Sequence, residues 1–75
     1  MKRSLSKQFG KSIRRLREEI GLTQVVLGEQ CGFHQTYLSR IESGQANPTV
    51  NAMEVLANAF GLSIYELCEE VQRTL

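Results

Sequence analysis

Apolar residues recur at helical spacing along this chain. In the first segment the steps between them are four, four, three and four residues, which is the pattern of an amphipathic helix with one inward face. The positions are Leu5, Phe9, Ile13, Leu16 and Ile20. Either Ser4 or Ser6 is a suitable N-cap, and Gly21 stands where a left-handed residue commonly ends a helix.

Four further helices are predicted by the same pattern and by capping residues. They span residues 24–31, 35–43, 50–60 and 64 onward. Their starts and stops are marked by Thr23, Gly32, Gly44, Thr49, Gly61 and the capping box Ser63–Glu66. The inward positions expected are Leu27, Cys31, Leu38, Ile41, Val50, Met53, Leu56, Ala57, Phe60, Ile64, Leu67, Cys68 and Val71. No strand or repeat is apparent, so we predict a single all-α domain of five helices over residues 1–75.

Composition places this domain among small globular proteins. A hydrophobic fraction of 41% is too high for a disordered chain, and 75 residues are too few for two separate cores. No apolar run approaches the roughly 20 residues of a membrane helix, and no apolar stretch follows the basic N-terminus as in a secretory signal. We therefore expect a cytoplasmic protein, in which Cys31 and Cys68 are reduced and buried.

Charge is unevenly distributed, although the net charge is only +1. Residues 1–40 hold eight Lys or Arg against three Glu, a balance of +5, whereas residues 41–75 hold one Arg against five Glu, a balance of −4. A polyanion would approach the first half and be repelled from the second. The alternative interpretation is that these charges only solvate the helix faces.

The second and third helices have the pattern of a helix-turn-helix over residues 24–43. Gly28 stands inside the second helix, where glycine is up to about 1 kcal/mol less favourable than alanine. A small residue there is expected if another helix crosses closely. Gly32 allows a sharp turn, and Phe33 is expected to fill the corner.

The third helix has one contiguous polar face opposite its inward residues. At 100° per residue this face spans about 140°. It consists of Gln35, Thr36, Ser39 and Arg40. Glutamine pairs bidentately with adenine and arginine with guanine, and a threonine methyl group can contact the methyl group of thymine. We predict that this helix reads base edges in the major groove of DNA.

Several short motifs in this order resemble one family. They are LTQ, CGF, YLSRIESG, NPT and AFGLS. Together they resemble the lambda-repressor-like helix-turn-helix family of Cro/C1-type, or xenobiotic-response-element, regulators over about residues 9–68. The short chain and the pair Thr36–Tyr37 also resemble controller proteins of restriction–modification operons. The resemblance implies a five-helix fold, double-stranded DNA as the partner and a role in transcription regulation.

The resemblance also implies roles for individual residues. Gln35, Thr36 and Arg40 match base-contacting positions. Gln24 matches a glutamine that binds a DNA phosphate and steadies Gln35. The other residues expected at the DNA backbone are Thr23, His34, Tyr37, Gln45 and Asn47.

Two of the matched positions have a structural interpretation. Glu42 near a helix C-terminus is unfavourable by itself, and in the family the matching acid pairs with an arginine that matches Arg17. We assign this ion pair to fold integrity. Tyr37 fits core packing with an outward hydroxyl as well as it fits a phosphate contact.

The chain departs from the family pattern at a few positions. Val25 and Val26 replace polar residues, Gly28 replaces a more usual alanine, and His34 is a weak N-cap. His34 is the chain's single histidine, and the chain lacks the clustered Cys and His of a metal site, so we expect no metal, no cofactor and no enzymatic activity. No small-molecule ligand is expected in a chain of this size.

A single recognition helix covers roughly four base pairs, so a homodimer on a pseudo-palindromic operator is expected. Residues 49–75 are the expected dimerisation side because they carry more apolar residues than a small core needs. The candidates are Tyr65, Cys68, Val71 and Leu75. The alternative is a solvated, frayed last helix.

A second function class uses the same fold. In an antitoxin or adaptor, Val25, Val26 and the last helix would bind a protein partner such as a toxin. A regulator would instead act by occupying DNA sites that overlap those of RNA polymerase.

Overall fold

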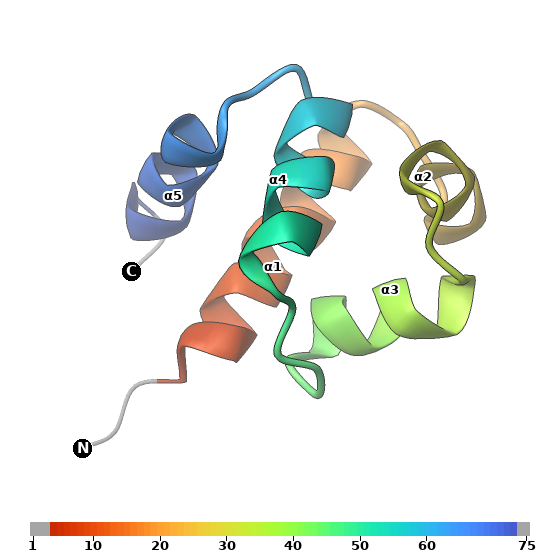
Figure 1. Ribbon diagram of the computed structural model, residues 1–75, viewed down its shortest axis with the longest axis horizontal. Coiled ribbons are helices and arrows are strands. Elements are labelled where there is room, and N and C mark those ends of the chain that lie inside the picture. The colour runs from red at the N-terminus through yellow and green to blue at the C-terminus, as the bar shows by residue number, and fades with distance from the viewer. Residues whose placement is uncertain (1–3, 74–75) are drawn as a thin grey trace.

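The computed structural model describes residues 4–73, which form five α-helices joined by short loops (Figure 1). The helices are α1 (Leu5–Glu19), α2 (Gln24–Cys31), α3 (Gln35–Ser43), α4 (Val50–Ala59) and α5 (Ile64–Arg73). Residues 4–73 contain no strand, which confirms the predicted all-α class. Within the same range, no helix has both the length and the apolar character needed to cross a membrane.

The helices begin at the caps that the sequence indicates. The side chains that accept a hydrogen bond from a first-turn backbone amide are those of Ser4, Thr23, His34 and Thr49. At α5 the predicted capping box is complete, because Ser63 Oγ accepts from the Glu66 amide at 3.1 Å and Glu66 Oε1 accepts from the Ser63 amide at 2.8 Å. These interactions lie within three residues of sequence.

One hydrophobic core joins all five helices. α1 packs against α3 and α5, and α4 contacts α2 and α5, an arrangement that Figure 1 shows with α5 at one end and the α2–α3 turn at the other. The buried core consists of Phe9, Ile13, Leu27, Leu38, Ile41, Leu56, Ala57 and Leu67.

Four residues that were predicted to face inward are instead exposed, namely Cys68, described below, and three aliphatic residues. Leu5, Ile20 and Val50 have exposed fractions of 67%, 52% and 68%. Leu5 and Val50 are the first residues of their helices, and Ile20 is the C-cap of α1. The helical period gives the angle of a residue around the helix axis. It does not say whether a neighbouring helix extends far enough along that axis to cover the residue.

The prediction that both thiols are buried is wrong. Cys31 is half-buried, and this burial raises the pKa of its thiol. Cys68 is exposed on α5, one residue after the fully buried Leu67.

Gly10, inside α1, determines how closely α1 and α3 approach each other. A Cβ atom on Gly10 would lie 2.6 Å from the carbonyl oxygen of Glu42 and closer still to that of Ile41. Both obstacles are backbone atoms of α3, which cannot rotate away as a side chain would. The apolar pattern of α1 does not indicate this close crossing, and the local signal that could have found it is a glycine inside a helix, as at Gly28.

Candidate nucleic-acid interface

The start of α3 is held by a sharp turn after α2. Gly32 has a left-handed backbone with φ of 73°, and the Phe33 amide donates to Gly28 O at 2.8 Å. A Cβ atom on Gly28 would lie 2.7 Å from the Phe33 carbonyl oxygen. The predicted close approach at Gly28 therefore exists, but its partner is the backbone of the turn and not a crossing helix.

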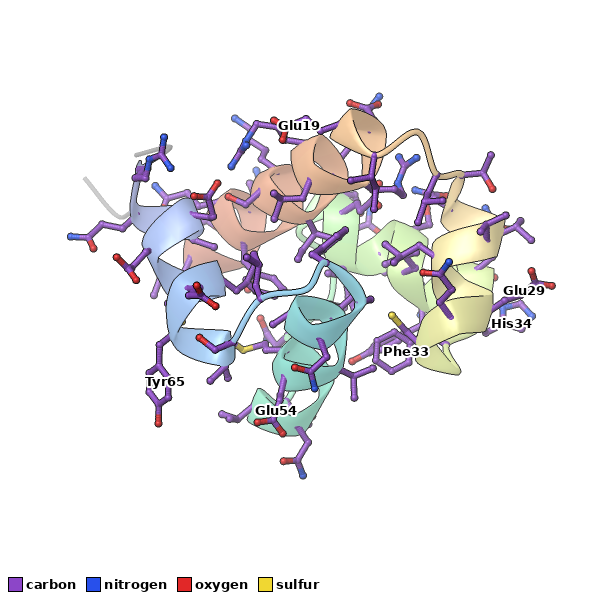
Figure 2. All side chains as sticks on the ribbon, turned by 90° about the horizontal axis from the view of Figure 1, so that it is seen from above. Glu19, Glu29, Phe33, His34, Glu54 and Tyr65 are labelled. Carbon is purple, nitrogen blue, oxygen red and sulfur yellow. The ribbon has the colours of Figure 1, made fainter. Side chains whose placement is uncertain are left out.

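Aromatic packing supports the same corner. Phe33 and Tyr37 are both half-buried, and their rings meet edge to face with centroids 5.2 Å apart. Figure 2 shows Phe33 and His34 at the α2–α3 turn. His34 caps α3 through its ring, because its Nδ1 accepts from the Thr36 amide at 3.1 Å. The placement of Tyr37 agrees with the packing interpretation of this residue.

The opposite faces of α3 differ sharply in exposure. Leu38 and Ile41 are fully buried, which turns the polar face of the helix outward. On that face, three of the predicted base-reading residues are exposed and Ser39 is half-buried. The exposed three are Gln35, Thr36 and Arg40.

Four side chains form a continuous series of hydrogen bonds that ends at this polar face. Arg17 Nε donates to Glu42 Oε2 at 2.7 Å and Arg17 Nη2 donates to Glu42 Oε1 at 3.0 Å. Gln24 Nε2 donates to Glu42 Oε1 at 3.1 Å, and Gln35 Nε2 donates to Gln24 Oε1 at 3.0 Å. We call these four residues the polar relay.

The polar relay is anchored in a buried ion pair. The side chains of Arg17 and Glu42 are only 11% and 3% exposed. The hydrogen bonds that Arg17 donates to Glu42 raise the pKa of the Arg17 guanidinium, which also donates to Leu22 O at 2.8 Å. The pairing of Arg17 with Glu42 and the contact of Gln24 with Gln35 were expected. The bond from Gln24 to Glu42 was not, and no local sequence signal indicates it.

The remaining residues predicted at the DNA backbone lie before α2 and in the loop after α3. Thr23 is exposed before α2, and its hydroxyl accepts from the Val26 amide. Gln45 and Asn47 are exposed in the loop after α3. Asn47 Oδ1 accepts a hydrogen bond from Ser6 Oγ, which ties this loop to α1.

Three of the six basic side chains described in residues 4–40 are paired within the molecule. Arginines of α1 pair with Glu18, Glu19, Glu42 and Glu70. Within residues 4–73, the basic side chains outside any ion pair are Lys7, Lys11 and Arg40, and all three are exposed. Free positive charge therefore remains on α3 and on the first half of α1.

The predicted dimerisation residues have different surroundings. Tyr65 projects from α5 at the end of the molecule away from Phe33 and His34 (Figure 2). Cys68 and Val71 line an apolar groove of about 410 Å³ between α1, α4 and α5, together with Leu5 and other residues. Leu75 lies outside the described residues. The sequence contained no signal of this groove, because its walls come from three helices and the loop before α4.

α2 and α3 form a helix-turn-helix, in which the second helix is held by its buried apolar face and exposes its polar face. This arrangement defines the class of helix-turn-helix DNA-binding domains. A family model described as helix-turn-helix matches residues 13–67, and the chain belongs to this family. Its relatives are regulators, and the chain is a sequence-specific DNA-binding transcriptional regulator.

Among curated proteins, the chain is 43% identical over 70 residues to the uncharacterized HTH-type transcriptional regulator y4dJ of Sinorhizobium fredii, covering 93% of this chain and 91% of that one. It is 31% identical to the control protein C.BamHI of Bacillus amyloliquefaciens, covering 81% and 76% of the two chains. Among solved structures, it is similar to the restriction–modification controller protein C.AhdI from Aeromonas hydrophila, with a TM-score of 0.79 and 32% identity over 83% of this chain and 94% of that chain.

Proposed function

We propose that this regulator binds a pseudo-palindromic operator as a cytoplasmic homodimer, with α3 of each protomer in a major groove. The observation that carries this proposal is the exposed face of Gln35, Thr36 and Arg40 on a helix whose other face is fully buried. An amide, a hydroxyl with a methyl group and a guanidinium offer the groups that distinguish bases in the major groove. Ser39 adds a hydroxyl at the centre of this face.

Contacts to phosphates would hold α3 in place on the DNA. Thr23, Gln24 and His34 lie near the amino ends of α2 and α3, where free amides and the helix dipole favour anions. Gln45 and Asn47 lie at the other end of α3 and serve the same purpose.

Lys7 and Lys11 extend this set of phosphate contacts. A Cβ atom on Gly44 would lie 2.5 Å from Lys7 Cγ, so the stem of Lys7 packs against the end of α3. Neither lysine is held in an ion pair within the described part of the chain, so each keeps its charge for a phosphate.

Arg40→Ala should weaken operator binding by about 1–3 kcal/mol and relax the preference at one base pair of each half-site. The operator is first selected from a random DNA pool, and binding of every single-base variant is then measured by fluorescence anisotropy. Lys11→Ala is the control, because loss of a phosphate contact should weaken binding evenly across sequences. An Arg40→Ala protein that binds the operator and all variants like the parent would contradict the assignment of α3.

The second copy of this chain is the proposed occupant of the apolar groove. Cys68 and Val71 line it together with Leu5, which is 67% exposed, so a second chain would remove further apolar surface from water. Gln8 also lines the groove, and its Oε1 is buried without a hydrogen-bond partner among the described residues, so a donor from a second chain would satisfy it.

The position of α5 suits a two-fold contact. α5 lies at the opposite end of the molecule from the α2–α3 turn (Figure 1), so both recognition helices stay free.

Leu5→Asp should weaken self-association about tenfold or more, because a charge would enter the apolar contact. Aspartate is well tolerated in the first turn of a helix, so the fold should be preserved. Val50→Asp is a matched control, since Val50 is equally exposed, also begins a helix and does not line the groove. Sedimentation equilibrium measures both variants. Parent-like association of Leu5→Asp, or dissociation of Val50→Asp, would place the contact elsewhere.

Exposed apolar residues on α2 favour a second candidate function. Val25 and Val26 are both exposed at the start of this helix. In an antitoxin or adaptor they would bind a protein partner, such as a toxin or a subunit of RNA polymerase. Co-purification from the native host with the parent and with a Val25→Ser variant distinguishes this role from DNA binding alone.

A further inference from the structure

We propose that Glu42 determines which hydrogen-bonding groups Gln35 presents to DNA, by fixing the orientation of the Gln24 amide between them. Glu42 is thus a positioning residue for base recognition as well as a member of a buried ion pair. This inference rests on the proposed role of Gln35 in reading a base.

The first step is set by the chemistry of a carboxylate. Glu42 is held by two hydrogen bonds from Arg17, and its side chain is 3% exposed. An ionised carboxylate can only accept hydrogen bonds. Gln24, whose side chain contacts Glu42 Oε1 at 3.1 Å, must therefore turn its NH₂ group toward Glu42.

The second step follows from the two different ends of an amide. With its NH₂ group at Glu42, Gln24 has only its carbonyl oxygen to offer to Gln35. Gln35 must then donate, and its Nε2 lies 3.0 Å from Gln24 Oε1. This leaves Gln35 one free N–H and the carbonyl oxygen for a ligand.

The third step connects this orientation to a base. One donor beside one acceptor matches N7 and the N6 amino group of adenine. If Gln24 were reversed, Gln35 would turn its oxygen toward Gln24 and present two N–H groups instead. Two donors match the N7 and O6 acceptors of guanine. Glu42 thereby favours adenine over guanine at this position, although it lies too deep to touch DNA.

The test compares base preferences at two positions of the selected operator. Loss of preference in Gln35→Ala and in Arg40→Ala identifies the base pair that each residue reads. Glu42→Gln replaces the acceptor by an amide of the same shape that can donate or accept, so both orientations of Gln24 become available. We expect the preference for adenine over guanine at the Gln35 position to fall about fivefold to tenfold. The preference at the Arg40 position should change less than about twofold, because no hydrogen bond or ion pair joins Arg40 to the polar relay.

Two further variants separate this role from a structural one. Arg17→Lys weakens the buried pair but leaves the carboxylate of Glu42 in place, so the adenine preference should be retained. In a Gln24→Ala background, Glu42→Gln should change the base preference no further. If it still does, Glu42 does not act through Gln24 and the inference is wrong.

The remaining outcomes are also decisive. A folded Glu42→Gln protein with unchanged preference, or with equal losses at both positions, overturns the inference alone. If Gln35→Ala alters no base preference, the proposed role of Gln35 fails and this inference fails with it. If Glu42→Gln does not fold, the double variant Arg17→Met with Glu42→Gln replaces it, because that protein contains no unpaired buried charge.

Discussion

Arg17→Met should destabilise the protein by about 3–5 kcal/mol, because it leaves the carboxylate of Glu42 buried without a counter-charge. Both guanidinium contacts to Glu42 are short, at 2.7 and 3.0 Å, and the pair is almost completely shielded from water. The Leu22 carbonyl also loses its donor. A domain of this size is stabilised by only about 3–5 kcal/mol, so much of the variant should be unfolded at 25 °C.

Urea denaturation at pH 7 measures this effect, and Arg14→Met is the matched control. Arg14 also pairs with a glutamate, Glu18, but both side chains are more than half exposed. Loss of such a surface pair should change stability by less than about 1 kcal/mol. If the two variants were destabilised equally, the buried pair would not be a principal support of the fold.

Gly10→Ala should destabilise the protein by about 1–3 kcal/mol. This is the reverse of the usual result, because replacing glycine by alanine inside a helix normally stabilises a protein. At an open position inside a helix, alanine is about 1 kcal/mol better than glycine. Here the added methyl group meets the backbone carbonyls of Ile41 and Glu42, so α3 must move away from α1. Because α3 carries the candidate base-reading residues, operator binding should weaken as well.

Thermal unfolding and operator binding together test this second prediction. Lys11→Ala is the control for stability alone, because it places the same residue at the neighbouring, exposed position and should leave stability within about 0.5 kcal/mol of the parent. A Gly10→Ala protein as stable as the parent would show that α1 and α3 can separate at this point without loss.

Much of the candidate site could be predicted because its signals are local. The polar face of Gln35, Thr36 and Arg40 follows from helical period once the start of α3 is known, and that start is marked by Gly32. Leu38 on the opposite face of α3 is fully buried, so the polar face of α3 is turned toward solvent. The candidate base-reading side chains therefore all belong to the nine consecutive residues of α3.

The contacts between helices could not be predicted from the pattern of apolar and polar residues alone. The bond between Gln24 and Glu42 joins the start of α2 to the end of α3, and nothing within either helix indicates it. The apolar groove likewise needs three helices to be placed before its walls exist. Leu5 and Val50 have the spacing of core residues but remain largely exposed at the first positions of their helices.

The sequence by itself determined the number of helices, their caps and the turn at Gly32, because each depends on interactions within about one helical turn. Only the tertiary structure decided how near α1 lies to α3, which charges are paired inside the molecule and which apolar residues stay exposed. Those properties depend on pairs such as Gly10 with Glu42 and Arg17 with Glu42. Such residues are distant in the chain and meet only when the helices pack, so no periodic pattern along the sequence contains them.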